Sequence, residues 1–251
     1  MLRALLIGIV LSFLAFAGFS ASYPFNPVLD NTDRFERHYR VTTAFPFLTS
    51  YLLLTPPDYD RRKRYPLVLA LHGGYKRSLG AYVAAQTEFQ KRHETFVLMP
   101  MALFGQHWVK IDANGAVVGP SASLREAVDI LADVAKDFPV DRSRVYVTGS
   151  SNGAIGTFAA MKHFPEVFAA GVAVNGGWPV DDAGAFRSAK LAIYHGTEDR
   201  LNPVGGMRAL VHAIRASGEA PEYVEMAGTG HDSRPAYRNT RLWDWLFARR
   251  L

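Results

Sequence analysis

From about residue 65 onward, short runs of apolar residues alternate with segments whose apolar positions recur at helical spacing. Leu67–Leu71 and Phe96–Met99 are uninterrupted apolar runs of the kind that form buried strands. Residues 81–92 and 124–138 have the spacing of amphipathic helices. The same alternation predicts strands at residues 145–148, 168–174, 191–194 and 223–226, helices at 204–216 and 236–248, and Ser121 or Ser123 as the cap of the helix at 124–138.

This alternation predicts an α/β domain with a mainly parallel sheet, because strands that are apolar on both faces need helices on both sides. Before the first of these apolar strands, residues 39–45 and 50–54 have the pattern of two antiparallel strands, with Pro46 near their turn. We therefore expect an eight-stranded-type sheet that binds ligands outside the carboxyl ends of its strands. The connection at 176–190 is too short for a separate cap domain, so the site should be open.

The first residues differ from this pattern. Arg3 precedes an apolar run from Ala4 to Phe19, which is followed by small residues. This is the layout of a secretory signal, and it predicts a signal peptide at 1–22 and a catalytic domain at 23–251. The run is short for a membrane span, although an uncleaved N-terminal anchor is the alternative. We expect a secreted or periplasmic protein with no stable membrane span after cleavage.

Composition and charge narrow the chemistry. The 251 residues are 49% hydrophobic and include no cysteine, so thiol chemistry and disulfides are excluded. The histidines lack metal-ligand spacing and no phosphate-binding glycine motif occurs, so no metal and no cofactor are expected. The net charge is +5, but the basic residues are dispersed and only residues 61–64 form a run. We interpret that run as a solvated loop and expect no nucleic-acid partner.

Gly149-Ser150-Ser151-Asn152-Gly153 carries the strongest chemical signal. It places Ser151 at the centre of a G-x-S-x-G pattern between an apolar strand and a helix-like segment. In a nucleophile elbow the chain turns sharply from strand to helix, and the glycines allow the strained turn that exposes the serine hydroxyl. An ordinary glycine-rich turn is the alternative. The pattern nevertheless makes Ser151 the candidate nucleophile.

A serine needs a base to remove its proton, and the base needs an acid to orient it. Asp199 follows the apolar strand at 191–194, and His231 lies in a glycine-rich loop after the next strand. The order Ser151, Asp199, His231 is that of a serine nucleophile elbow on an α/β-hydrolase sheet. Glu198 is the competing acid, and His195 is interpreted as structural.

Acyl transfer also needs donors for the oxyanion. The turn after Leu71 offers the backbone N–H groups of Gly74 and Tyr75, opposite that of Asn152. His72 is expected to brace this turn rather than act as a base. Trp178 follows a strand, and Trp108 lies in the long connection at 100–120 that could overhang the site; both are candidate substrate-binding residues.

The motifs LHGG, GSSNG, HGTED and GTGH, in this order within residues 38–251, resemble those of the α/β-hydrolase superfamily. The chain is most similar to secreted esterases: polyhydroxybutyrate-depolymerase-like, feruloyl-esterase-like and phospholipase/carboxylesterase-like proteins. The resemblance implies hydrolysis of carboxylic esters through an acyl-enzyme. Depolymerase-like members often carry a cysteine where this chain has Gly74, which argues against a polymer-degrading assignment.

The sequence therefore predicts a serine esterase in which Ser151 attacks, His231 transfers the proton and Asp199 orients His231. The substrate would be a small-molecule or polymer-derived ester. Two alternatives use the same fold: a serine peptidase, since fold and triad do not specify the bond, and a non-catalytic binding protein that has kept the pocket.

Overall fold

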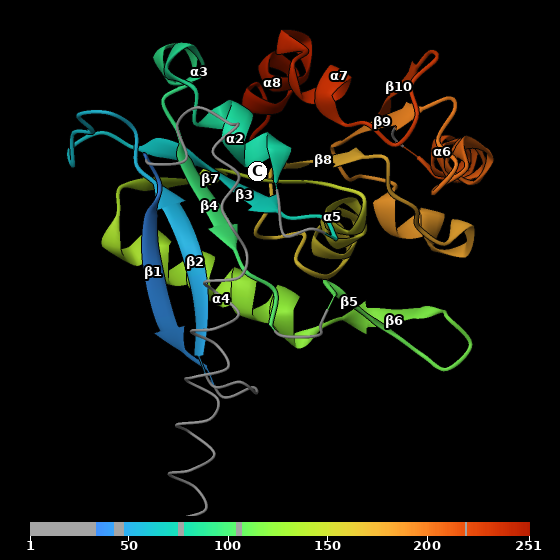
Figure 1. Ribbon diagram of the computed structural model, residues 1–251, viewed down its shortest axis with the longest axis horizontal. Coiled ribbons are helices and arrows are strands. Elements are labelled where there is room, and N and C mark those ends of the chain that lie inside the picture. Colours follow the sequence, from blue (N-terminus) through green and yellow to red (C-terminus); the bar gives the residue numbers. More distant parts are fainter. Residues whose placement is uncertain (1–33, 43–47, 75–77, 104–106, 219) are drawn as a thin grey trace, which may run out of the picture.

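The computed structural model describes residues 34–42, 48–74, 78–103, 107–218 and 220–251. An eight-stranded sheet runs through the molecule in the order β1-β2-β4-β3-β7-β8-β9-β10 (Figure 1). Strands β1 and β2 pair antiparallel, β2 also pairs antiparallel with β4, and the remaining pairs are parallel. The strands are β1 (Glu36–Val41), β2 (Leu48–Leu54), β3 (Tyr65–Leu71), β4 (Phe96–Pro100), β7 (Val140–Ser150), β8 (Ala170–Val174), β9 (Leu191–Gly196) and β10 (Glu222–Met226).

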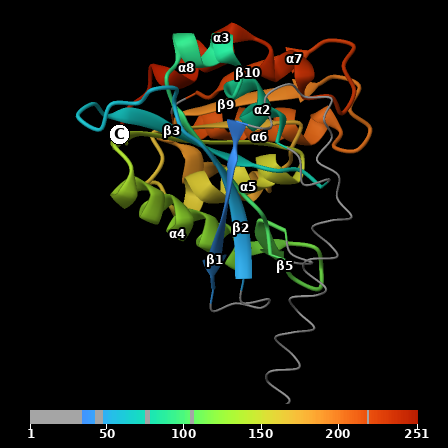
Figure 2. The ribbon, with the colours of Figure 1, turned by 60° about the vertical axis from the view of Figure 1, so that its left-hand side comes forward.

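Helices cover both faces of this sheet, as Figures 1 and 2 show. Each face has its own hydrophobic core, one built with α4, α5 and α6 and the other with α2, α7 and α8. The helices are α2 (Leu79–Ala84), α3 (Thr87–Arg92), α4 (Ala122–Asp137), α5 (Asn152–His163), α6 (Val204–Ser217), α7 (Arg234–Tyr237) and α8 (Thr240–Phe247), with a 3₁₀ segment η2 (Val180–Phe186).

Strand β3 shows how the sequence builds these two cores. Leu67, Leu69 and Leu71 point into the core under α4 and α5, whereas Val68 and Ala70 point into the core under α2 and α8. Side chains alternate between the faces of a strand, so only a continuous apolar run can fill both cores. The five-residue apolar run therefore predicted a central strand correctly.

The predicted helices at 81–92 and 236–248 are each broken into two. In the first, the buried Gln90 side chain donates to the carbonyl of Ala84 at 2.8 Å, and Gln86 adopts an extended conformation between α2 and α3. In the second, Asn239 caps α8 by accepting from the N–H of Arg241. In the sequence, the apolar residues keep a helical spacing across both breaks. This is because the two short helices of each pair bury their apolar residues against the same face of the sheet.

The connection at 100–120 contains a hairpin that the sequence pattern did not predict, formed by β5 (Val109–Ile111) and β6 (Val117–Pro120). The predicted cap of α4 is correct for Ser121, whose side chain accepts from the N–H of Leu124. Pro46 and the predicted signal segment lie outside the described residues. None of the described helices is long and apolar enough to cross a membrane.

Candidate active site

The carboxyl end of β7 forms a sharply strained turn at Ser151. Its backbone angles are φ 56° and ψ −122°, an unusual combination for a residue with a side chain. The flanking glycines are required sterically. A Cβ at Gly149 would lie 2.3 Å from the Gly153 carbonyl oxygen, and one at Gly153 would lie 2.4 Å from the carbonyl oxygen of Leu71. Ser151 itself is only partly buried.

The turn after β3 packs directly against this serine. A Cβ built on Gly73 would lie 3.3 Å from the carbonyl oxygen of Ser150 and 3.8 Å from the Cβ of Ser151. Gly74 follows and is exposed, with no heavy atom within 4 Å of its own Cβ position. The space beside Gly74 is therefore open, and Tyr75 lies outside the described residues.

His72 fixes the shape of this turn. Its Nε2 accepts a hydrogen bond from the N–H of Ala102 at 3.0 Å, so in the neutral ring the proton is on Nδ1. Nδ1 lies 2.8 Å from the carbonyl oxygen of Gly73 and donates to it. In a trans peptide the C=O and the following N–H point in opposite directions. This bond therefore sets the direction of the Gly74 N–H, and the sequence interpretation of His72 as a brace agrees with it.

Asp199 and His231 meet after β9 and β10. His231 Nδ1 lies 2.7 Å from one carboxylate oxygen of Asp199, whose side chain is fully buried. The other oxygen accepts from the N–H groups of Leu201 and Asn202, each at 2.9 Å. These bonds fix the carboxylate, and the carboxylate fixes the proton of His231 on Nδ1. Nε2 is then left as a base.

Asn175 connects the acid loop to the nucleophile strand, and the sequence analysis did not identify it. Its side-chain oxygen accepts from the N–H of Gly196, and its carbonyl accepts from the Asn202 side chain at 2.8 Å. The preceding residue, Val174, accepts from the N–H of Ser151 at 2.9 Å. Asn175 has φ 52°, a conformation that asparagine tolerates. The only sequence signal is an asparagine before two glycines at a strand end.

These contacts bring the predicted triad residues to one edge of the sheet, at the carboxyl ends of β7, β9 and β10. Among the described residues, the Ser151 hydroxyl and His231 are not hydrogen bonded to each other; such bonds often tighten only when substrate binds. The competing acid Glu198 has an exposed side chain. His195 is buried, and its Nε2 lies 2.7 Å from the carbonyl oxygen of Asn202, which agrees with a structural role.

The two tryptophans predicted to contact substrate are both buried. Trp108 is fully buried; its indole N–H donates to the His72 carbonyl at 2.9 Å and its ring lies against the His72 ring. Trp178 is 8% exposed, packs against the rings of Phe158 and Phe186, and donates to Asp182. Position after a strand could not distinguish a pocket wall from a core residue. In the described part of the chain, no group of three or more potential ligands could hold a metal.

Comparison with known proteins agrees with this architecture. A sequence model described as the prolyl oligopeptidase family matches residues 121–180, the segment that contains the nucleophile elbow. A solved structure of a thermostable esterase superposes with a TM-score of 0.80 at 27% identity, over 87% of this chain and 64% of that one.

Two curated relatives are larger proteins. The chain is 28% identical over 139 residues to poly(3-hydroxyalkanoate) depolymerase C of Paucimonas lemoignei, covering 53% of this chain and 33% of the relative. It is 25% identical over 149 residues to dipeptidyl-peptidase 5 of Porphyromonas gingivalis, covering 56% of this chain and 21% of the relative. The chain thus spans a third or less of the length of both. The sheet order, the elbow and these likenesses identify the chain as a member of the α/β-hydrolase superfamily.

Proposed function

We propose that the protein is a serine hydrolase that cleaves carboxylic esters through an acyl-enzyme, with Ser151, His231 and Asp199 as its catalytic triad. The observation that carries this proposal is the 2.7 Å bond between a fully buried Asp199 carboxylate and His231, at the same sheet edge as the strained Ser151. The 27% identity with a thermostable esterase supports an ester as the substrate.

In the first step His231 Nε2 removes the hydroxyl proton of Ser151 as the oxygen attacks the ester carbonyl. Asp199 holds the imidazole in the required tautomer and stabilises the imidazolium that forms. His231 then donates that proton to the leaving alcohol, which gives the acyl-enzyme. Water attacks the acyl-enzyme with the same histidine as base, and the acid is released while Ser151 regains its proton.

The tetrahedral intermediate needs backbone donors for its oxyanion. Asn152 is the first residue of α5, a position whose N–H has no partner within the helix. The second proposed donor is the N–H of Gly74, whose direction is set by the His72 bond to the Gly73 carbonyl. We assign the N–H groups of Asn152 and Gly74 to the oxyanion hole. The N–H of Tyr75, which the sequence also predicted as a donor, is part of the same proposal.

Two variants of His72 should show whether its side chain acts by orienting the turn at Gly73 and Gly74 or only by packing. The amide of asparagine can replace the Nδ1 donor to Gly73, whereas that of glutamine can replace the Nε2 acceptor for Ala102. We expect His72→Gln to lower kcat by about 10- to 100-fold, since an oxyanion donor would be misdirected, and His72→Asn to retain more activity. KM should change little in both. A His72→Gln enzyme as fast as His72→Asn would contradict this role, with thermal unfolding measured to compare their stabilities.

The ester assignment is tested by parallel kinetics and by labelling. We expect p-nitrophenyl acetate to be hydrolysed much faster than the matching anilide, and a fluorophosphonate probe to label Ser151 in the folded protein, because only an activated serine reacts. Faster cleavage of the anilide or of peptides would favour the peptidase alternative. Absence of both labelling and turnover would favour the non-catalytic binding protein.

We also propose that the protein is exported, secreted or periplasmic, on the basis of the apolar N-terminal segment. The mass of the mature chain after expression in a host with a secretory pathway would test this. Loss of about the first 22 residues supports cleavage, whereas an intact chain in the membrane fraction would support the anchor alternative.

A further inference from the structure

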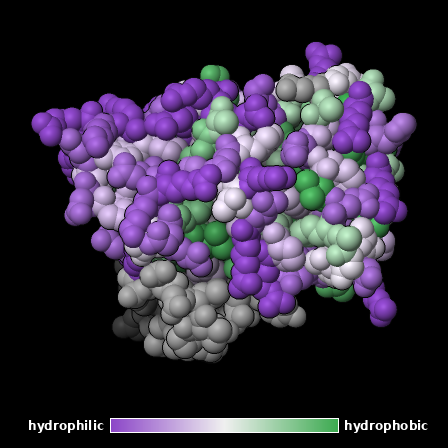
Figure 3. All heavy atoms as spheres, turned by 90° about the horizontal axis from the view of Figure 1, so that it is seen from above, coloured by the Kyte–Doolittle hydropathy of each residue, from purple (hydrophilic) through white to green (hydrophobic). Residues whose placement is uncertain are grey.

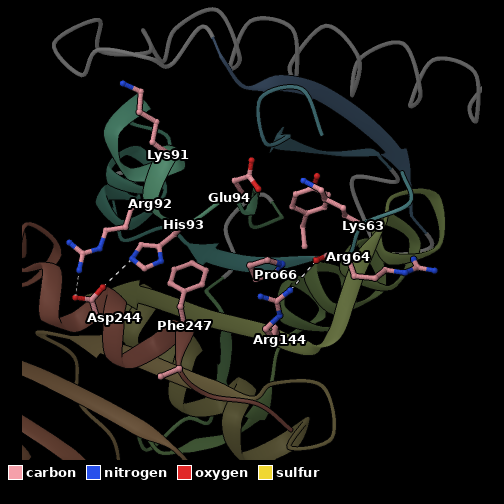
Figure 4. A pocket seen from close by; sticks show the side chains of 12 residues that line it. Lys63, Arg64, Pro66, Lys91, Arg92, His93, Glu94, Arg144, Asp244 and Phe247 are labelled. Carbon is pink, nitrogen blue, oxygen red and sulfur yellow. Dashed lines mark hydrogen bonds and ion pairs between the residues drawn. The ribbon is translucent and has the colours of Figure 1, made fainter. Parts of the chain in front are cut away.

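A second cleft, of about 600 Å³, lies away from the triad, at the start of β3 (Figure 4). Its walls come from the loop before β3, the end of α3, the first half of β7 and the end of α8. Five cationic side chains and two carboxylates line it, together with His93 and Phe247. The lining charges are Lys63, Arg64, Lys91, Arg92, Arg144, Glu94 and Asp244.

One wall of the cleft is electrically balanced. Arg92 lies 2.6 Å from a carboxylate oxygen of Asp244, and His93 lies 3.2 Å from the other, as the dashed lines of Figure 4 mark. The His93 ring also stacks on Phe247 at 4.5 Å with an interplanar angle of 8°. This wall is a fixed, partly aromatic surface whose charges are already paired.

The opposite wall carries surplus positive charge. Lys63, Arg64 and Arg144 lie on this side in Figure 4. Lys63 and Arg64 are exposed, and within the described part of the chain neither forms an ion pair. The loop between β2 and β3 projects on the left of the molecule in Figure 1. Figure 3 shows that the surface on that side is mainly hydrophilic. Glu94, a lining carboxylate that forms no ion pair among the described residues, faces the same cleft, so Lys63 and Arg64 leave a net surplus of positive charge there.

Arg144 fixes the geometry of this wall. Its Nε lies 2.7 Å from a carboxylate oxygen of Asp141, and its Nη2 donates to the carbonyl of Arg64 at 3.0 Å. The Arg144 side chain is 24% exposed, and its guanidinium joins the backbone of the basic loop to β7. Because Arg64 is held through its backbone, less conformational freedom is lost when its side chain binds a ligand.

We propose that this cleft binds a small anion that carries carboxylate or phosphate groups. The exposed cations Lys63 and Arg64 outnumber the unpaired carboxylate Glu94 in the cleft, and guanidinium groups bind carboxylate and phosphate with paired hydrogen bonds. The volume is within the range of small-molecule sites. The site goes beyond the ester hydrolysis proposed above, and it gives Lys63 and Arg64, the last two residues of the basic run at 61–64, a binding role in place of a purely solvated one.

The cleft and the triad lie at opposite ends of the same strand. β3 begins at Tyr65, which lines the cleft, and ends at Leu71, next to the turn that packs on Ser151. Seven residues of strand span roughly 20 Å. A bound anion would therefore not compete with an ester for the active site, so ligand binding and hydrolysis can be measured separately.

Isothermal titration of the full chain with citrate and with pyrophosphate tests the proposal. We expect saturable one-to-one binding of at least one of these probes at low ionic strength, weakened as salt screens the charges. The variant Lys63→Glu/Arg64→Glu should bind the same probe at least tenfold more weakly. Its hydrolysis of a p-nitrophenyl ester should stay at the wild-type rate, which also reports that it is folded.

Arg61→Glu/Arg62→Glu is the matched control, because it makes the same change of charge in the same loop with residues that do not line the cleft. We expect it to weaken binding by less than twofold. Equal losses in the two variants would mean that net charge alone attracts the probe and would overturn the site. Failure of both probes to saturate would also overturn it, including the case in which the protein binds only anionic phosphatidylglycerol vesicles.

Discussion

Replacing Ser151 with alanine is expected to lower kcat for a p-nitrophenyl ester by about 10⁴- to 10⁶-fold, because the covalent route is lost when the nucleophile is removed. The fold should be unaffected. The Ser151 side chain does not cap α5, and the backbone of the elbow is fixed by its own N–H bond to Val174 and by the packing of Gly149 and Gly153. Steady-state kinetics, with circular dichroism to compare folding, would measure both effects.

Ser150→Ala is the matched control, since Ser150 is the adjacent serine, is also partly buried and ends β7 on the strand side of the elbow. Its activity should stay within a few-fold of the wild type. If Ser151→Ala retained near-wild-type hydrolysis, the serine hydrolase proposal would fail. If instead Ser150→Ala were the inactive variant, the elbow would have been assigned to the wrong serine.

The sequence was sufficient to predict a mainly parallel sheet with helices on both faces, because each central strand has to fill two cores. Leu67–Leu71 had to be apolar at every position, and such a run has few alternatives to a buried parallel strand. The strand ends then located the candidate residues, since the carboxyl ends of parallel strands share one edge. Ser151, Asp199 and His231 could be placed at one edge without any tertiary information.

What the sequence could not provide was the role of side chains that act through the backbone. Asn175 uses its own carbonyl and side-chain oxygen to hold the acid loop, and no periodicity marks such a residue. Trp178 follows a strand and Trp108 lies in the connection at 100–120, as pocket residues would, yet both are buried. The break at Gln86 depends on a buried amide, Gln90, that replaces helical hydrogen bonds. Each of these features is decided by tertiary contacts between groups that local patterns do not connect.

Replacing Asp199 with asparagine is expected to lower kcat by about 10⁴-fold with the fold intact, as loss of the correct histidine tautomer does in serine proteases. The surroundings fix how the amide would lie. The N–H groups of Leu201 and Asn202 both donate to one oxygen of Asp199, so the amide oxygen must take that position. The NH₂ group then faces Nδ1 of His231, which must give up its proton to accept the bond.

The proton would consequently lie on Nε2 of His231, where it blocks that nitrogen from acting as the base for Ser151. Glu198→Gln is the matched control, because it makes the same chemical change one residue earlier, on an exposed side chain, and it should alter kcat by no more than a few-fold. A large loss in Glu198→Gln together with an active Asp199→Asn enzyme would reverse the assignment of the acid. Near-normal activity in both variants would show that the 2.7 Å bond between Asp199 and His231 is structural rather than catalytic.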